Sequence, residues 1–185
     1  MDRRRWAEEY ATSLLAGDER RLGHTQAVAA HASALAERLI ADPVESDALV
    51  AAAWLHDIGY APELATTGAH HLDGALHLAD IGEGRLACLV AHHGSGEAEA
   101  RLRGLGPEFA HFPAESSLVS DLLTYCDLSS GPNGTSTTLA DRLRDVRARY
   151  GDNHVVVRGL DASSDLIQGV FRRVEDAIAR RRTGV

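Results

Sequence analysis

Lysine is absent from this chain of 185 residues, and all 19 of its basic residues are arginine. Any cationic contact to an anionic ligand must therefore come from arginine, which can bind phosphate bidentately, or from a metal ion. Acidic residues number 27, which gives a formal net charge of −8. Nucleic-acid binding rests on an excess of positive charge, so we expect no general binding of nucleic acid. A small phosphorylated ligand stays open, because metal ions can reverse the charge locally.

Cysteine and long hydrophobic runs are also scarce. The two cysteines, Cys88 and Cys126, lie in apolar helical contexts and are expected to be free buried thiols. The longest uncharged apolar run, Leu49–Leu55, is too short to span a bilayer. The first ten residues are charged and do not resemble a signal peptide. We therefore expect a cytoplasmic protein with no membrane partner, whose oligomeric state the sequence leaves open.

Aromatic residues make up 5 % of the chain and hydrophobic residues 44 %, so the core should consist of packed aliphatic helices. Apolar positions recur at helical spacing along most of the sequence. They predict helices at about 4–15, 20–40, 47–57, 71–80, 84–93, 97–104, 117–128, 138–150 and 164–182. Only residues 153–160 have strand propensity, and one short run cannot form a sheet. We predict an all-α helical bundle that forms a single domain over 1–185, with helices 138–182 packed on a core at about 20–134.

Ten histidines are present, and several fall at the ends of predicted helices beside glycine-containing loops. These are His24, His56, His70, His71, His92 and His93. Asp57 and Asp127 also lie at predicted helix ends, where side chains of separate helices can converge on one cleft. Neutral imidazole and carboxylate together suit first-row divalent ions. The set therefore predicts a metal site.

His56 and Asp57 are adjacent, so on a helix their side chains point about 100° apart. His56 could then reach one ion while Asp57 binds the same ion or lies between two. A carboxylate that bridges two ions would hold them about 3.5–4 Å apart, the spacing found in two-metal hydrolases.

Helical spacing alone leaves two choices open among the other histidines. His24 and His31 lie seven residues apart, as do His70 and His77, so the members of each pair share a helix face. Only one histidine of each pair is expected to be a ligand.

The series His24, His56-Asp57 and Asp127 resembles the H…HD…D signature of the HD superfamily of metal-dependent phosphohydrolases. The segment Trp54–Tyr60 reads WLHDIGY and matches the apolar-HD-I-G pattern of that family. Arg21-Leu22-Gly23-His24, followed by Val28, matches the segment around the first histidine and favours His24 over His31. The resemblance runs from about residue 20 to 134, where the polar loop 129–134 follows Asp127.

Two further segments resemble the subset of this family that holds two metal ions. His70–Ala75 matches an H-P-x-x-G-A segment, with His71 in place of the proline, and favours His70 over His77. His92-His93 matches an HH pair whose first member is a ligand in relatives. The resemblance implies a site for two divalent ions, among Fe, Mn, Co, Ni, Zn and Mg, with Asp57 as the bridge. The implied ligands are His24, His56, Asp57, His70, His92 and Asp127.

The resemblance implies a phosphohydrolase that attacks a small phosphorylated compound, a phosphomonoester or phosphodiester such as a nucleotide, with a metal-activated water. Asp57 and His93 are the expected catalytic residues, His93 as a proton donor or a contact to substrate. Arg21, one turn before His24, is a candidate to bind a substrate phosphate.

Two other functions stay open on the same residues. One is a di-iron oxygenase of the same fold that cleaves a C–C or C–P bond, and the other is a metal-bearing regulatory module without turnover. The chain lacks the G-Y-P motif of cyclic-di-GMP phosphodiesterases and an E-D pair after HD of the kind found in guanosine tetraphosphate hydrolases, which argues against those substrates.

Overall fold

A computed structural model describes residues 2–131 and 136–183 of the chain. The described residues form helices and no strand, apart from one isolated antiparallel bridge between Ser130 and Ser136. The elements are α1 (Arg3–Leu14), α2 (Glu19–Leu39), α3 (Pro43–Leu55), the short 3-10 helix η1 (Ile58–Tyr60), α4 (His70–Asp80), α5 (Gly84–His92), α6 (Gly96–Leu102), α7 (Gly106–Phe109), α8 (Leu118–Leu128), α9 (Leu139–Tyr150), α10 (Val155–Ala162) and α11 (Ser164–Thr183). The predicted all-α fold is confirmed.

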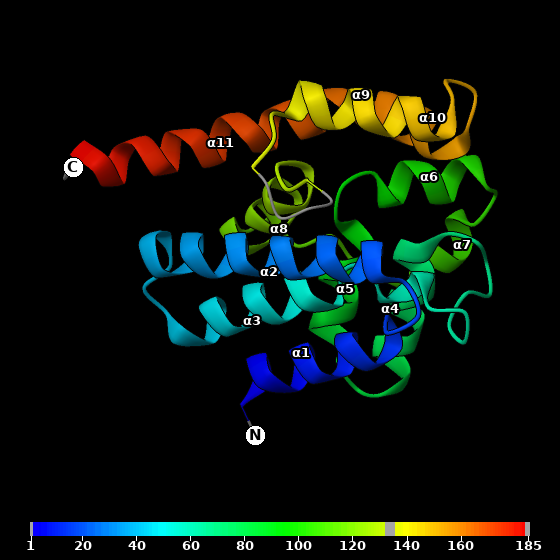
Figure 1. The fold of residues 1–185 in the computed structure, drawn as a ribbon, viewed down its shortest axis with the longest axis horizontal. Helices are drawn as coiled ribbons and strands as arrows, with labels where there is room; N and C mark the ends of the chain where they lie inside the picture. The colour runs from blue at the N-terminus through cyan, green and yellow to red at the C-terminus, as the bar shows by residue number, and fades with distance from the viewer. Residues whose placement is uncertain (1, 132–135, 184–185) are drawn as a thin grey trace.

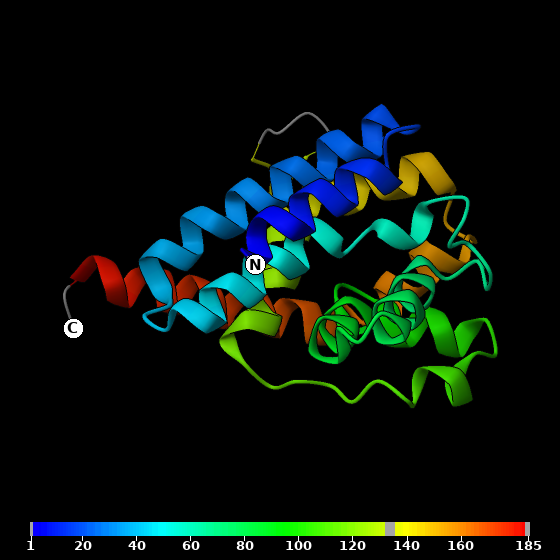
Figure 2. The same cartoon turned by 90° about the horizontal axis from the view of Figure 1, so that it is seen from below.

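Helices α1, α2 and α3 lie side by side in both views of the molecule, and α8 packs against α2 and α3 (Figures 1 and 2). Helices α4 and α5 form a second pair beside them. Helix α11 crosses α8 and α2, and Val170 and Val174 of α11 belong to the same buried cluster as residues of α1–α8. This shared core packs the end of the chain on the central bundle, while the division of the chain into domains stays a prediction.

A smaller apolar cluster fixes α9 and α10 above the central bundle. It joins Leu128 at the end of α8 to Val146 of α9, Val157 and Leu160 of α10, and Ile167 of α11. The segment with strand propensity is therefore helical. Val157 and Leu160 are three residues apart and bury one face of α10, and this packing outweighs the β-propensity of the preceding valines.

Capping residues set the starts of the helices that carry the functional side chains. Asp18 accepts a hydrogen bond from the Arg21 amide at the start of α2, and Ser117 does the same for Ser120 at the start of α8. Of the polar loop expected at 129–134, residues 129–131 are described and 132–134 lie outside the described residues.

Gly59 allows η1 to approach α4 closely. A Cβ atom at this position would collide with the backbone carbonyl of His70 and would lie 2.6 Å from the Gly74 nitrogen. Only glycine fits such an approach of two backbones. The glycine of the His56-Asp57-Ile58-Gly59 turn thus brings the turn against the start of α4, where His70 and His71 lie.

None of the helices in the described ranges combines the length and the apolar character needed to cross a membrane.

Candidate metal centre

His56 follows the last residue of α3, and Asp57 directly precedes η1. The exposed fractions are 0 % for His56 and 3 % for Asp57, so the pair is buried. His56 Nδ1 donates a hydrogen bond to the Ala53 carbonyl oxygen at 2.7 Å, so Nε2 is the ring nitrogen available to an ion. This Nε2 is buried and has no hydrogen-bond partner within the described structure. An imidazole fixed through one nitrogen, with the other free, is the usual state of a metal ligand.

His24 of α2 and Asp127 of α8 complete the surroundings of His56. Asp127 Oδ1 lies 3.0 Å from His24 Nε2 and 4.0 Å from His56 Nε2. His24, His56 and Asp57 each offer one ligand atom, and these three atoms all lie within 4.8 Å of one another. Helices from distant parts of the chain thus bring the residues of the H…HD…D series to one place.

The Asp57 carboxylate lies between this group and a second one. Its Oδ2 is 3.6 Å from His56 Nε2, and its Oδ1 is 3.4 Å from His70 Nε2. Burial raises the pKa of Asp57, but attraction to the positive guanidinium of Arg21 is the main opposing effect, and the pKa lies well below its usual range. Asp57 is therefore ionised and presents one oxygen to each histidine group.

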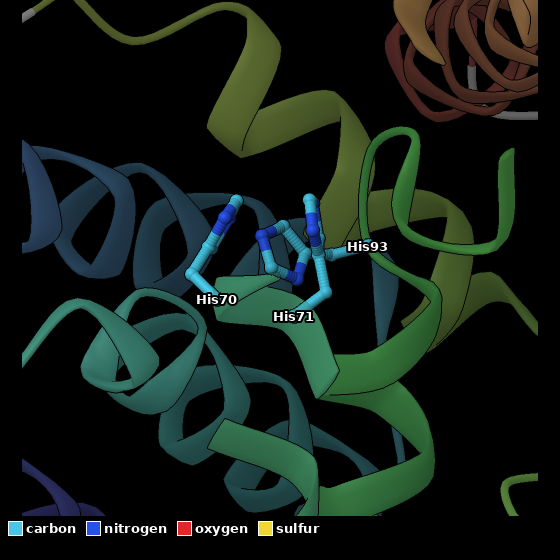
Figure 3. A group of neighbouring side chains, drawn as sticks. All are labelled: His70, His71 and His93. Carbon is cyan, nitrogen blue, oxygen red and sulfur yellow. The ribbon is translucent and has the colours of Figure 1, made fainter. Parts of the chain in front are cut away.

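The second group consists of His70 and His71 at the start of α4 and His93 directly after α5, and the three rings lie close together (Figure 3). Their ligand nitrogens also lie within 4.8 Å of one another. His93 Nδ1 donates to the Val90 carbonyl oxygen at 2.6 Å, so its Nε2 is free to bind an ion. Burial lowers the pKa of all three imidazoles, which are therefore neutral at pH 7, as metal ligands must be.

His92 does not join this group, although the resemblance implied it as the ligand of the HH pair. Its Nε2 donates a hydrogen bond to the Phe112 carbonyl oxygen at 2.7 Å, and its ring meets the edge of Phe109. Helix α5 ends at His92, and His93 has an extended backbone. Only one of the two adjacent side chains can face α4, and the structure turns His93 towards it.

The members of the two histidine pairs that helical spacing left open differ in their positions. His31 lies two turns beyond His24, where its ring meets Tyr125. His77 lies two turns beyond His70, where its ring nitrogen is 2.6 Å from the Tyr10 hydroxyl oxygen of α1. The structure brings His24 and His70 to Asp57, and it places His31 and His77 elsewhere.

A model of the HD-domain family matches residues 21–143, more than half of the chain. The chain belongs to the HD-domain family. Members of this family are generally metal-dependent hydrolases. Comparisons with curated proteins and with solved structures each found no match. The matched part of the HD domain contains both histidine groups and Asp127, whereas α10 and the end of α9 lie beyond it.

The residues of the HD domain fit divalent metal ions. Two buried groups each offer three ligand atoms, and the nitrogens His56 Nε2 and His71 Nδ1 are buried without a hydrogen-bond partner among the described residues. Unpaired polar atoms in a protein interior are costly unless a ligand satisfies them. Burial raises the pKa of Asp127, but the hydrogen bond with His24 and the nearby guanidinium of Arg142 oppose this effect, and the net pKa is lowered. This carboxylate is therefore ionised as well.

Two buried arginines contact the carboxylates of the HD domain. Arg21 Nη1 lies 2.7 Å from Asp57 Oδ2, and its guanidinium stacks 3.4 Å from the centroid of the Tyr60 ring. Arg142 of α9 places one Nη 3.2 Å from His24 Nε2 and 3.6 Å from Asp127 Oδ1. Both side chains are about nine-tenths buried, and the Nε atoms of both have no hydrogen-bond partner within the described ranges.

A pocket opens above the candidate metal ligands, between them and the helices α9 and α10. Asp57, Asp127 and the three histidines of the second group lie on one side. Val146, Val156 and Leu160 form an apolar wall on the other side, next to Arg142 and Arg149. A ligand in this pocket would contact metal, arginine and apolar surface at once.

The sequence prediction gave no specific role to two site residues, His71 and Arg142. His71 stands where the resemblance has proline, and its Nδ1 lies 3.8 Å from Glu99 Oε2, a buried carboxylate of α6. Arg142 belongs to an arginine-rich helix, but it lies three residues after Leu139 and four before Val146, on the apolar face of α9. An arginine in an apolar stripe is the signal that could have identified it.

Proposed function

We propose that this HD domain is a metal-dependent phosphohydrolase that acts on a small phosphorylated compound. The observation that carries the proposal is the position of Asp57, whose carboxylate lies between two buried histidine groups. A carboxylate in this position can be shared by two cations, as in two-metal hydrolases. The net charge of −8 favours a small substrate over nucleic acid, because nucleic-acid binding rests on an excess of positive charge.

The proposal assigns ligands to two ions. The residues for the first are His24, His56, Asp57 and Asp127, and those for the second are Asp57, His70, His71 and His93. His93 takes the place of His92, and it is proposed as a ligand instead of a proton donor because its only free nitrogen faces His70 and His71.

Divalent ions held there would act as Lewis acids towards phosphoryl oxygens and would make a bound water nucleophilic at neutral pH. The ionised carboxylates of Asp57 and Asp127 would offset part of the positive charge of these ions. The guanidinium groups of Arg21 and Arg142 lie close enough to offset the negative charge that develops on a phosphoryl group. The apolar wall of Val146, Val156 and Leu160 limits the entry of bulk water.

The experiment is elemental analysis of the purified protein, paired on the same preparation with a screen for phosphate release. The screen covers phosphomonoesters, phosphodiesters and nucleotides in the presence of Mn, Co, Ni or Fe. We expect metal-dependent phosphate release that the variants His56→Ala and Asp57→Ala lose together with bound metal. His31→Ala is the control, since this histidine lies on the same helix as His24 but outside the site.

Two results would overturn the proposal. Oxygen consumption with a phosphonate or a polyol by protein loaded anaerobically with iron would indicate an oxygenase. Inactivity of fully metal-loaded protein on the whole panel would indicate a regulatory module.

A further inference from the structure

A small hollow beside the metal site is lined almost entirely by arginine. Its lining consists of His24 and four arginines, namely Arg20, Arg21, Arg142 and Arg149. No carboxylate is among these lining residues. Arg21, Arg142 and Arg149 also line the larger pocket above the metal ligands, so the hollow adjoins it on the far side of Arg142. Four like charges around one hollow repel one another unless an anion lies between them.

The charges at the site are balanced without an added ligand and become positive when metal binds. The guanidinium groups of Arg21 and Arg142 face the two carboxylates of Asp57 and Asp127. Divalent ions at the histidine groups would bind these same carboxylates and compete with both arginines for them. Arg21 would then lack a protein partner of opposite charge, and Arg142 would keep only Asp145, which lies 3.8 Å away and also pairs with Arg149. Both side chains are already about nine-tenths buried and have an unpaired Nε. An anionic ligand supplies that partner.

Arg149 stands at the outer side of the hollow. It forms an ion pair with Asp145, and its side chain is one-quarter exposed. Its guanidinium lies 5.7 Å from the centroid of the Tyr150 ring. Arg142 lies two helical turns before Arg149, so both side chains leave the same face of α9. No ion pair is found for Arg20 among the residues that the structure describes. The hollow thus shares three arginines with the pocket above the metal ligands, and one of them, Arg149, is partly exposed to solvent.

We infer that the four arginines form a second phosphate-binding subsite, and that the substrate carries at least two phosphate groups, as in a diphosphate or a longer chain. One group would face the metal ligands, and the adjacent one would lie among Arg20, Arg21, Arg142 and Arg149. Arginine is suited to this role because its planar fork binds phosphate oxygens bidentately. The inference rests on the proposed function for the identity of the reacting group, but the binding subsite can be measured without turnover.

The test compares two ligands that are not hydrolysed, methylphosphonate and methylenediphosphonate. Calorimetric titration of the manganese-loaded protein gives the affinity of each, and elemental analysis gives the metal content. The variants are Arg149→Gln and Arg142→Gln. The matched control is Arg144→Gln, which removes the same charge from the same helix at an exposed position. Arg149→Gln keeps the test decisive if Arg142→Gln fails to fold, since Arg149 does not contact Asp57 or Asp127.

We expect either variant to weaken diphosphonate binding by about tenfold or more, the range for a lost charge-assisted hydrogen bond. Arg149→Gln should change methylphosphonate binding by less than about threefold, leave metal content unchanged, and differ from the control. Diphosphonate affinity equal to that of the wild type in both folded variants would overturn the inference, as would an equal loss for both ligands in Arg149→Gln. A protein that releases no phosphate from any ester, but whose variants show the expected changes in diphosphonate and methylphosphonate affinity, would overturn the proposed function. It would still support the inferred subsite.

Discussion

His92 and His93 are neighbours in sequence but contact different parts of the molecule. His93 faces His70 and His71, whereas His92 donates to the Phe112 carbonyl oxygen. We expect His93→Ala to lose one of the two ions that the proposed function assigns, with an affinity loss beyond the roughly 10–100-fold that removal of an outer-shell partner costs. His92→Ala should keep both ions and lose only about 0.5–1.5 kcal/mol of unfolding free energy with its hydrogen bond.

Elemental analysis after dialysis against a weak chelator measures the ions, and chemical denaturation measures the free energy. His92→Ala is the matched control for His93→Ala, because it removes the same side chain one position away. Loss of an ion in His92→Ala, with both retained in His93→Ala, would contradict the assignment.

Single residues show what a sequence can and cannot predict. The order of His24, His56-Asp57 and Asp127 along the chain identified residues that the fold brings together. The choice between His92 and His93 depends on the backbone after α5, where His93 has φ −66° and ψ 146°. No residue type at this position indicates that turn, so the sequence could not decide which imidazole faces α4.

At the scale of elements, the contact of η1 with α4 depends on Gly59. We expect Gly59→Ala to destabilise the fold by at least about 1–3 kcal/mol, the usual cost of overpacking, because the added methyl group collides with the His70 backbone. The displaced α4 would carry His70 and His71 away from Asp57, so metal affinity should fall as well. Thermal unfolding with and without metal measures both effects.

Gly17→Ala is the control for this substitution. A Cβ atom at Gly17 meets nothing within 4 Å, so the same change there should leave stability and metal content nearly unaffected. A Gly59→Ala protein as stable as the wild type would show that the close approach of η1 and α4 is not needed.

Helix positions were largely predictable because apolar residues recur at helical spacing along the chain. The roles of α9 and α10 could not be predicted from the sequence. Helix α10 is helical because Val157 and Leu160 pack on α8, α9 and α11, a tertiary effect that local propensity does not contain. The inward direction of Arg142 likewise depends on the packing of Val146, four residues later, on the same cluster.

At the scale of the whole molecule, the interior holds ionisable groups that acid would charge or neutralise. Burial lowers the pKa of His70, His71 and His93 below their ordinary value of 6.5. The unfolded chain therefore binds more protons than the folded chain as the pH falls below 6.5, and the free energy of unfolding decreases. The lowered pKa values of Asp57 and Asp127 act in the same direction below their ordinary value of 3.8.

We therefore expect the metal-free protein to be most stable above pH 6.5 and its melting temperature to fall by about 5 °C or more between pH 7 and pH 5. Thermal unfolding in a chelator over this pH range measures the change. His71→Gln should make the melting temperature less dependent on pH, because it removes one of the three buried imidazoles that resist protonation. His111→Gln removes an exposed imidazole and should leave the profile unchanged. A melting temperature that stays constant from pH 7 to pH 5, or rises, would mean that these histidines can take up protons in the folded protein without cost, and such imidazoles would not be held neutral for metal binding.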